Sequence, residues 1–162
     1  MNLYQLVVFL HVMGLFGFLM AHGVSASVYF ALQHERNVDR LRVLLQLSTS
    51  VARVMLLSLL VLLVTGVIAG FMGQWWSRGW IWLSVILLVV IYVAMAGLGS
   101  RVLNQFRQGI GLPSSYGQPP QAEPLSAAEM NALLNRAQPA RLTLIGFGGL
   151  AIIAWLMLFK PF

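Results

Sequence analysis

The sequence predicts an all-α membrane protein, a bundle of four transmembrane helices in a single domain. Of its 162 residues, 59% are hydrophobic and 9% are charged, whereas a soluble domain carries roughly 25% charged residues. The apolar residues form four runs of about 18 to 28 residues, and one crossing of the hydrocarbon core takes about 20. We therefore expect helices at about 4–32, 51–72, 80–100 and 142–159 within one membrane domain, residues 1–162.

The first two helices are separated by a polar stretch at 33–42. The first run begins at Leu3 without a basic segment before it and is too long for a signal peptide, so we interpret it as a retained helix. Ser48, Thr49 and Ser50 each offer a side-chain oxygen that can cap the first turn of the second helix.

Tryptophans flank the short turn at 74–79 between the second and third helices. Trp favours the headgroup level of a bilayer, where its ring stays in apolar surroundings and its N–H meets water. The turn therefore predicts an antiparallel hairpin of the second and third helices. The tryptophans are Trp75, Trp76, Trp80 and Trp82.

The connection at 101–141 leaves the membrane, because four prolines between 113 and 124 exclude a continuous helix. Ser126 and Glu129 have the spacing of a capping box. They predict a short amphipathic helix at about 127–137. We expect its apolar residues Met130, Leu133 and Leu134 to lie against the cytoplasmic membrane surface.

The orientation follows from the basic residues, which collect in cytoplasmic loops. Arg36, Arg40, Arg42 and Arg53 flank the first connection, and Arg101, Arg107, Arg136 and Arg141 flank the long one. Arg78 and Lys160 are at the other side. This distribution predicts both termini on the outer side of a bacterial inner (cytoplasmic) membrane, with the long connection in the cytoplasm.

Composition also excludes several functions. The chain has no cysteine, which removes disulfides, iron–sulfur clusters and thiol catalysis. Its four carboxylates, Glu35, Asp39, Glu123 and Glu129, are in the connections, so they form no intramembrane acid–base pair. The net charge of +6 lies in loops and indicates contact with lipid, not nucleic acid. We expect no enzymatic activity.

The polar residues of the first helix share one stripe, which we expect to face the bundle interior or a protein partner. It contains His11 and His22, which are about 16 Å apart along the helix axis. Intramembrane histidines are candidates for binding haem b, bacteriochlorophyll or copper. The alternative is an interhelical hydrogen bond to Ser, Thr or Tyr.

Other helices offer a second ligand only as methionine. The predicted topology places Met55 and Met95 at the depth of His22, and Met72 and Met157 at the depth of His11. A histidine with a methionine suits haem iron or Cu(I), whereas methionine in a membrane helix also serves as packing.

Two basic residues are expected at the cytoplasmic helix ends near His22. Arg53 and Arg101 either extend to lipid phosphates or bind an anionic ligand such as a haem propionate.

These observations favour a small non-catalytic membrane protein that binds haem b or a pigment, or that is an accessory subunit of an electron-transfer complex. Because the histidines lack an imidazole partner within the chain, we expect a homo-oligomer or a larger membrane complex. In the alternative, a monomer, Tyr92, Thr65 or Ser84 satisfies the histidines.

The segments L-H-V-M-G-L-F-G-F-L (Leu10 to Leu19) and A-H-G-V-S-A (Ala21 to Ala26) resemble the opening of a group of bacterial four-helix membrane proteins. That group in turn resembles the CopD copper-resistance membrane proteins. The resemblance covers the first helix and the basic connection after it. It implies copper handling or transport as the alternative function, with His11 as a metal-binding residue.

Overall fold

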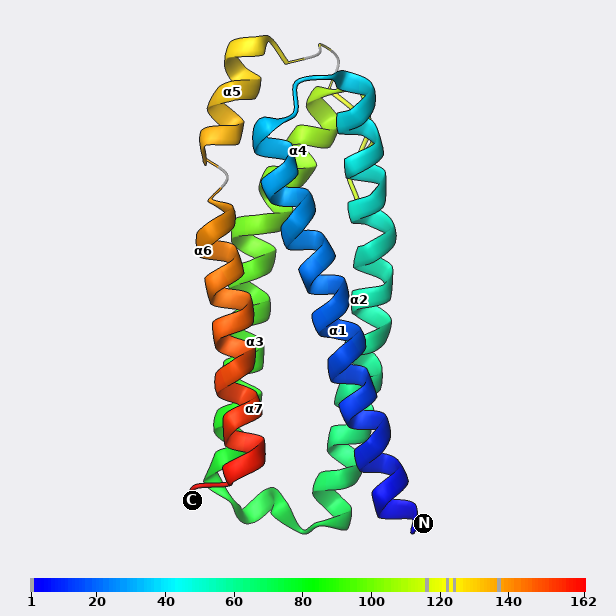
Figure 1. Ribbon diagram of the computed structural model, residues 1–162, viewed down its shortest axis with the longest axis vertical. Coiled ribbons are helices and arrows are strands. Elements are labelled where there is room, and N and C mark those ends of the chain that lie inside the picture. The colour runs from blue at the N-terminus through cyan, green and yellow to red at the C-terminus, as the bar shows by residue number, and fades with distance from the viewer. Residues whose placement is uncertain (1, 116, 122, 124, 137) are drawn as a thin grey trace.

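The computed structural model describes residues 2–115, 117–121, 123, 125–136 and 138–162. Four long helical rods lie side by side (Figure 1). The third rod and the fourth rod each contain a π-helical turn. The rods are α1 (Leu3–His34); α2 (Val38–Met72); α3 (Gly79–Met95) with the π-turn η2 (Ala96–Ser100) and α4 (Arg101–Gly109); and α6 (Pro139–Thr143) with the π-turn η3 (Leu144–Gly148) and α7 (Gly149–Phe159).

Each rod is long and apolar enough to cross a membrane. The predicted class, four long apolar helices in an all-α bundle, is confirmed, and the chain has the features of a multi-pass membrane protein. Both chain termini lie at the same end of the bundle (Figure 1). We call this the termini end, and we call the opposite end, with the 35–37 and 110–126 connections, the loop end.

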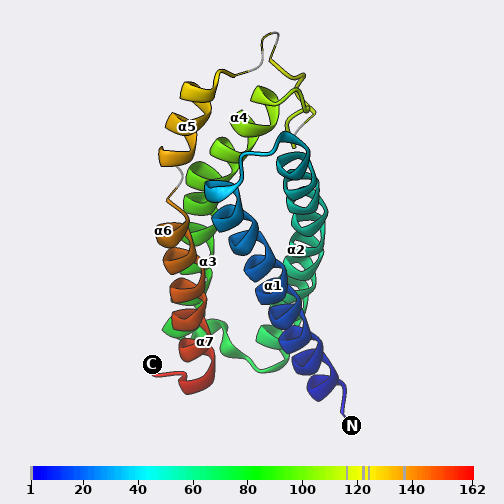
Figure 2. The same cartoon turned by 45° about the horizontal axis from the view of Figure 1, so that its top comes forward.

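The rods form two pairs. α1 packs along α2, and α3 packs along α7, as both views show (Figures 1 and 2). Glycine permits the first close approach, because a Cβ on Gly14 would lie 3.0 Å from the backbone nitrogen of Leu62. The pairs meet mainly at the loop end, where α6 contacts α1 and α4 contacts α2.

The rods differ in length, and this extends the bundle beyond one bilayer at the loop end. The 21 residues of the fourth rod span about 31 Å, close to the ~30 Å hydrocarbon core, whereas the 35 residues of α2 span about 52 Å. The loop ends of α1, α2 and α4 share a core of their own. It consists of Val28, Leu32, Leu41, Leu45, Phe106 and Ile110.

α2 begins at Val38, so the predicted start at residue 51 was wrong. The side chain of Asn37 caps the helix by accepting hydrogen bonds from the backbone N–H groups of Asp39 and Arg40, at 2.9 and 3.2 Å. Thr49 and Ser50 do not cap. Their hydroxyls donate to the carbonyls four residues earlier, which keeps them inside a continuous helix.

The third rod continues past its predicted end at residue 100. α4 adds 9 residues, because its Phe106 is buried against α1 and α2 although its other residues are largely polar. The rod ends before Gly111, whose φ of +80° suits glycine. The fourth rod begins at Pro139, not at 142, with proline in the first turn.

The short helix of the long connection is present as α5 (Ala127–Arg136). Its capping box is confirmed, because Glu129 accepts from the Ser126 backbone N–H at 2.9 Å and Ser126 Oγ accepts from the Glu129 N–H at 3.3 Å. Met130 and Leu133 are partly buried against the core at the loop end, and the expected contact of this helix with the membrane surface stays a prediction. The side chain of Leu134 lies outside the described residues.

The tryptophan turn lies at the termini end and includes the short 3₁₀ helix η1 (Trp75–Ser77). Trp75 packs against Trp80, and Trp76 against Trp82, each with ring centroids 5.6 Å apart. The ammonium group of Lys160 lies 4.1 Å from the centroid of the Trp75 ring, a cation–π contact. α2 and α3 run antiparallel from this turn, as predicted, but they do not pack along each other, since α3 packs along α7.

Candidate functional site

His11 is held by a hydrogen bond between α1 and α2. Its Nδ1 lies 2.8 Å from the carbonyl oxygen of Leu62 and 3.3 Å from Oγ1 of Thr65. Because a carbonyl only accepts, Nδ1 carries the proton and donates it. A Cβ on Gly66 would lie 2.9 Å from Cε1 of His11, so glycine makes room for the ring. Thr65 is thus a partner of His11 within the chain.

His22 lies on the same stripe of α1 but has no such bond. The residue is 5% exposed, and its Nε2 is buried without a hydrogen-bond partner among the described residues. Phe18 stacks on the imidazole with ring centroids 6.3 Å apart, and Phe147 lies at 4.8 Å. Nε2 lies against Gly146 in η3, where a Cβ would clash with it. The fourth rod therefore forms a wall for His22 that only glycine permits.

His22 lines a cavity of about 320 Å³ between the two helix pairs. This volume is at the lower end of the range for small-molecule sites. Leu56 and Tyr92 line the cavity and are 54% and 60% exposed, so the wall is open toward the bilayer. All four rods contribute lining residues, η2 and η3 included. π-Turns within α-helices are frequent at functional sites.

The two methionines expected at the depth of His22 are at the cavity. Met55 and Met95 both line it, and Met95 also packs against Tyr29 and Leu142. The methionines expected near His11 have other surroundings. Met157 packs against the core around Trp80, and Met72 is 42% exposed.

Arg53 and Arg101 are exposed and do not line the cavity. Their chain neighbours Ala52 and Ser100 do line it. Arg53 and Arg101 are therefore adjacent in sequence to residues that line the cavity, but they do not line it themselves.

Tyr29 joins α1 to the π-turn of the third rod. Its hydroxyl donates to the carbonyl of Gly99 at 2.7 Å, and the residue is buried. Of the other hydroxyls considered for the histidines, Ser84 donates to the Trp80 carbonyl at 2.8 Å, and Tyr92 lines the cavity.

The cavity residues that the sequence analysis missed as site residues include Ser100, Thr143 and Gly146. The signal that marks them is the grouping of glycines at 97–99 and 146–149, where the two π-turns form.

Arg107 is a second residue whose role the sequence did not indicate. It is 8% exposed and makes no ion pair with any described carboxylate. Its guanidinium donates to the carbonyls of Pro113 and Leu45 at 2.8 and 3.0 Å, and to Oγ1 of Thr49 at 2.6 Å. These bonds attach the start of the long connection to α2.

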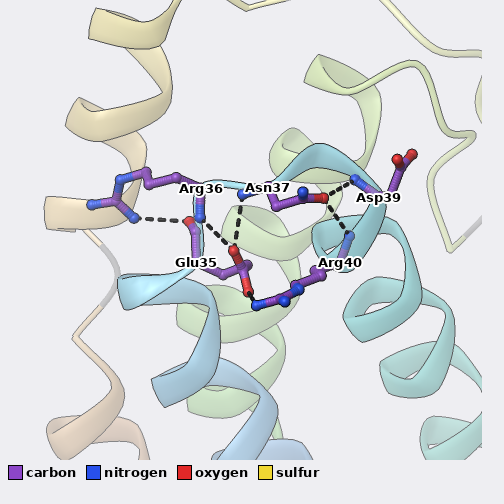
Figure 3. Close-up of polar contacts among 5 residues, drawn as sticks. All are labelled: Glu35, Arg36, Asn37, Asp39 and Arg40. Carbon is purple, nitrogen blue, oxygen red and sulfur yellow. Dashed lines mark hydrogen bonds and ion pairs between the residues drawn. The ribbon is translucent and has the colours of Figure 1, made fainter.

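The charged residues of the short connection bind one another (Figure 3). Glu35 accepts from the backbone N–H groups of Asn37 and Arg36, both at 2.9 Å, and lies 3.6 Å from Arg40. The N–H of Asn37, followed by that of Arg36, holds the pKa of Glu35 below its usual value. Among the described residues, no three His, Asp or Glu side chains gather as metal ligands would.

Comparisons of the chain with protein-family models, with curated proteins and with solved structures find no match.

Proposed function

We propose that the chain is a small non-catalytic membrane subunit that binds haem b in the His22 cavity, within an electron-transfer complex. One observation carries the proposal: a buried imidazole whose Nε2 has no partner among the described residues lines a cavity of about 320 Å³. A buried polar group without a partner is costly, and a bound group that uses it removes that cost.

The side chains around the cavity suit haem iron in their chemistry. His22 supplies the imidazole, and Met95 or Met55 supplies a thioether from another rod. Ligation requires Nε2 to turn away from Gly146, a rotation of the ring about its Cβ–Cγ bond. Bound haem would supply one-electron chemistry, and the chain would supply the ligand, the apolar walls and the orientation.

An absorption spectrum of the protein purified in mild detergent and loaded with haemin tests this proposal. We expect a Soret band that His22→Ala abolishes, and a shifted band in Met95→Leu or Met55→Leu, whichever residue is the second ligand. His11→Ala is the matched control, because His11 lies on the same stripe of α1 but does not line the His22 cavity. Equal spectra for His22→Ala and wild type would overturn the proposal.

Copper handling at His11 is the second candidate function, favoured by one contact. A histidine that donates Nδ1–H to a backbone carbonyl leaves Nε2 for a metal, the usual arrangement of a metal-binding histidine. Stoichiometric copper after loading, measured by elemental analysis and lost in His11→Ala, would support this function. Copper that persists in both His11→Ala and Met157→Leu would contradict it.

We also propose that the loop end is cytoplasmic and both termini are outside, in a bacterial inner membrane. The support is the eight arginines near the loop end against Arg78 and Lys160 at the termini end. Ser115→Cys and Ser77→Cys place single thiols on exposed residues at opposite ends. We expect an impermeant thiol reagent added outside to label only Ser77→Cys; labelling of both would contradict the proposal.

We further propose that the protein works as a homo-oligomer or within a larger complex. Thr65 and the Leu62 carbonyl satisfy His11 within the chain, so the support now rests on His22 alone. Native mass spectrometry from mild detergent tests the proposal. Finding monomers only, with no crosslinked partner in native membranes, would contradict it.

A further inference from the structure

The loop end of the His22 cavity holds three hydroxyl groups from three different segments. They belong to Ser25 in α1, Ser100 at the end of η2 and Thr143 at the end of α6. Two contacts place these segments at one level: Tyr29 bonds to the carbonyl of Gly99, and the side chain of Leu142 lies next to Gly99. The hydroxyls therefore share one end of one cavity.

None of these three hydroxyls forms a hydrogen bond with another described residue. Five other helical hydroxyls donate to the carbonyl four residues earlier, namely those of Ser27, Thr49, Ser50, Thr65 and Ser84. The hydroxyls of Ser25, Ser100 and Thr143 make no such bond on half-buried residues that line the cavity, so they are available as donors to a ligand.

The other end of the cavity is apolar. Phe18, Leu59, Leu88 and Leu150 line it. Phe18 and Tyr29 are eleven residues apart on α1, about 16 Å along the axis. A ligand that matches this wall has an apolar body toward the termini end and a hydrogen-bond acceptor at the loop end.

Charge favours an anionic acceptor over a neutral one. Arg53, Arg101 and Arg141 are exposed, and each lies within two residues of a lining residue at the loop end, namely Ala52, Ser100 and Thr143. The described Asp and Glu side chains lie in the connections, in the first turn of α2 and in α5, and none lines the cavity. The local potential is therefore positive, which stabilises a carboxylate near the membrane boundary.

We propose that Ser25, Ser100 and Thr143 bind the carboxylate of an amphiphilic ligand whose apolar body fills the rest of the cavity. This rests on the proposed function in using the same cavity, but it does not require iron or His22 ligation. It selects haem b, which has free carboxyl groups, over bacteriochlorophyll, whose carboxyl groups are esterified. A fatty acid offers the same chemistry.

The test uses metal-free protoporphyrin IX and its dimethyl ester, titrated by fluorescence into the full-length protein in neutral detergent. We expect the diacid to bind about tenfold or more tightly than the diester. The triple variant Ser25→Ala/Ser100→Ala/Thr143→Val should bind both equally. Ser27→Ala is the control, because this exposed serine of α1 bonds to its own helix. Oleate and methyl oleate, used as competitors, distinguish a fatty acid from a porphyrin.

The outcomes separate this inference from the proposed function. Equal binding of diacid and diester to wild type, or a preference that persists in the triple variant, would overturn the carboxylate site. So would failure of both the diacid and oleate to bind. A preference for the diacid, together with a haem spectrum that is the same in His22→Ala and wild type, would support the carboxylate site and overturn haem ligation by His22. Displacement by oleate but not by methyl oleate, without porphyrin binding, would support the site and identify an acyl ligand.

Discussion

Two levels of α1 carry the same residue type on the same stripe and differ in what faces them. At the level of His11, α2 is close enough for the Leu62 carbonyl to accept a hydrogen bond at 2.8 Å. At the level of His22, the facing wall is Gly146 of the fourth rod, and Nε2 remains without a partner. Helix periodicity predicts that both histidines face inward, but the group that the next rod presents, a carbonyl oxygen at His11 and a glycine at His22, decides whether each is satisfied.

The difference follows from how the rods pair. α1 and α2 are neighbours in sequence and contact along their length, with Gly14 and Gly66 permitting close approach. His22 lies where α1 faces the other pair, and there a cavity separates the rods. The imidazole of His11, within a tight pair, is bonded and stabilises the fold, whereas Nε2 of His22, between the pairs, is available to a ligand. Substitutions at the two levels test this difference.

The largest effect is expected at Gly146. Gly146→Ala places a Cβ against Nε2 of His22, and overpacking of this kind costs roughly 1–3 kcal/mol of unfolding free energy. Gly97→Ala is the matched control, because a Cβ there meets nothing within 4 Å. SDS-induced unfolding in mild detergent measures both. Adding His22→Ala to Gly146→Ala should recover stability. Equal losses of unfolding free energy in Gly146→Ala and Gly97→Ala would contradict the close contact between Gly146 and His22.

A smaller effect is expected from replacing each histidine by leucine, which has a similar volume. His11→Leu removes the bond to α2 and should lower the unfolding free energy by about 1 kcal/mol. His22→Leu removes no hydrogen bond and should lower it by less than His11→Leu does. Tyr29→Phe, which deletes the 2.7 Å bond to Gly99, serves as a reference for one lost interhelical bond. Equal losses at His11 and His22 would remove the contrast between the two levels.

The same contrast shows how far sequence reasoning reaches. The apolar runs, the tryptophan turn and the Ser126–Glu129 cap were predictable because each depends on residues close in sequence. The start of α2 was not, because hydroxyl residues that can cap a helix can also bond within one, as Thr49 and Ser50 do. Arg107 was counted as a loop cation, and its burial depends on Leu45 and Thr49, far away in the chain.

The candidate site was predictable in part for the same reason. Periodicity and topology bring His22 and Met95 to one cavity. They do not give the π-turns that bring Ser100 and Gly146 to its wall, because a π-turn changes the register of every residue after it. They also placed Arg53 and Arg101 at helix ends, which was wrong, because α2 and the third rod continue past these residues, and both arginines are exposed outside the cavity lining.

The smallest expected effect is a pH dependence of the stability of α5 at the loop end, away from both histidines. Hydrogen bonds from the Ser126 hydroxyl, followed by its backbone N–H, hold the pKa of Glu129 below the ordinary 4.5. A carboxylate whose pKa is lower in the folded state than in the unfolded state stabilises the folded state at any pH above the unfolded-state pKa. This contribution is lost as the pH falls through the folded-state pKa. Glu129→Ala should therefore speed hydrogen exchange of α5 amides relative to wild type at pH 7, and the ratio of the two rates should approach one at pH 3. Ser126→Ala should give the same loss at pH 7, since the cap is reciprocal. A rate ratio that does not change with pH would show that the charge of Glu129 does not stabilise α5.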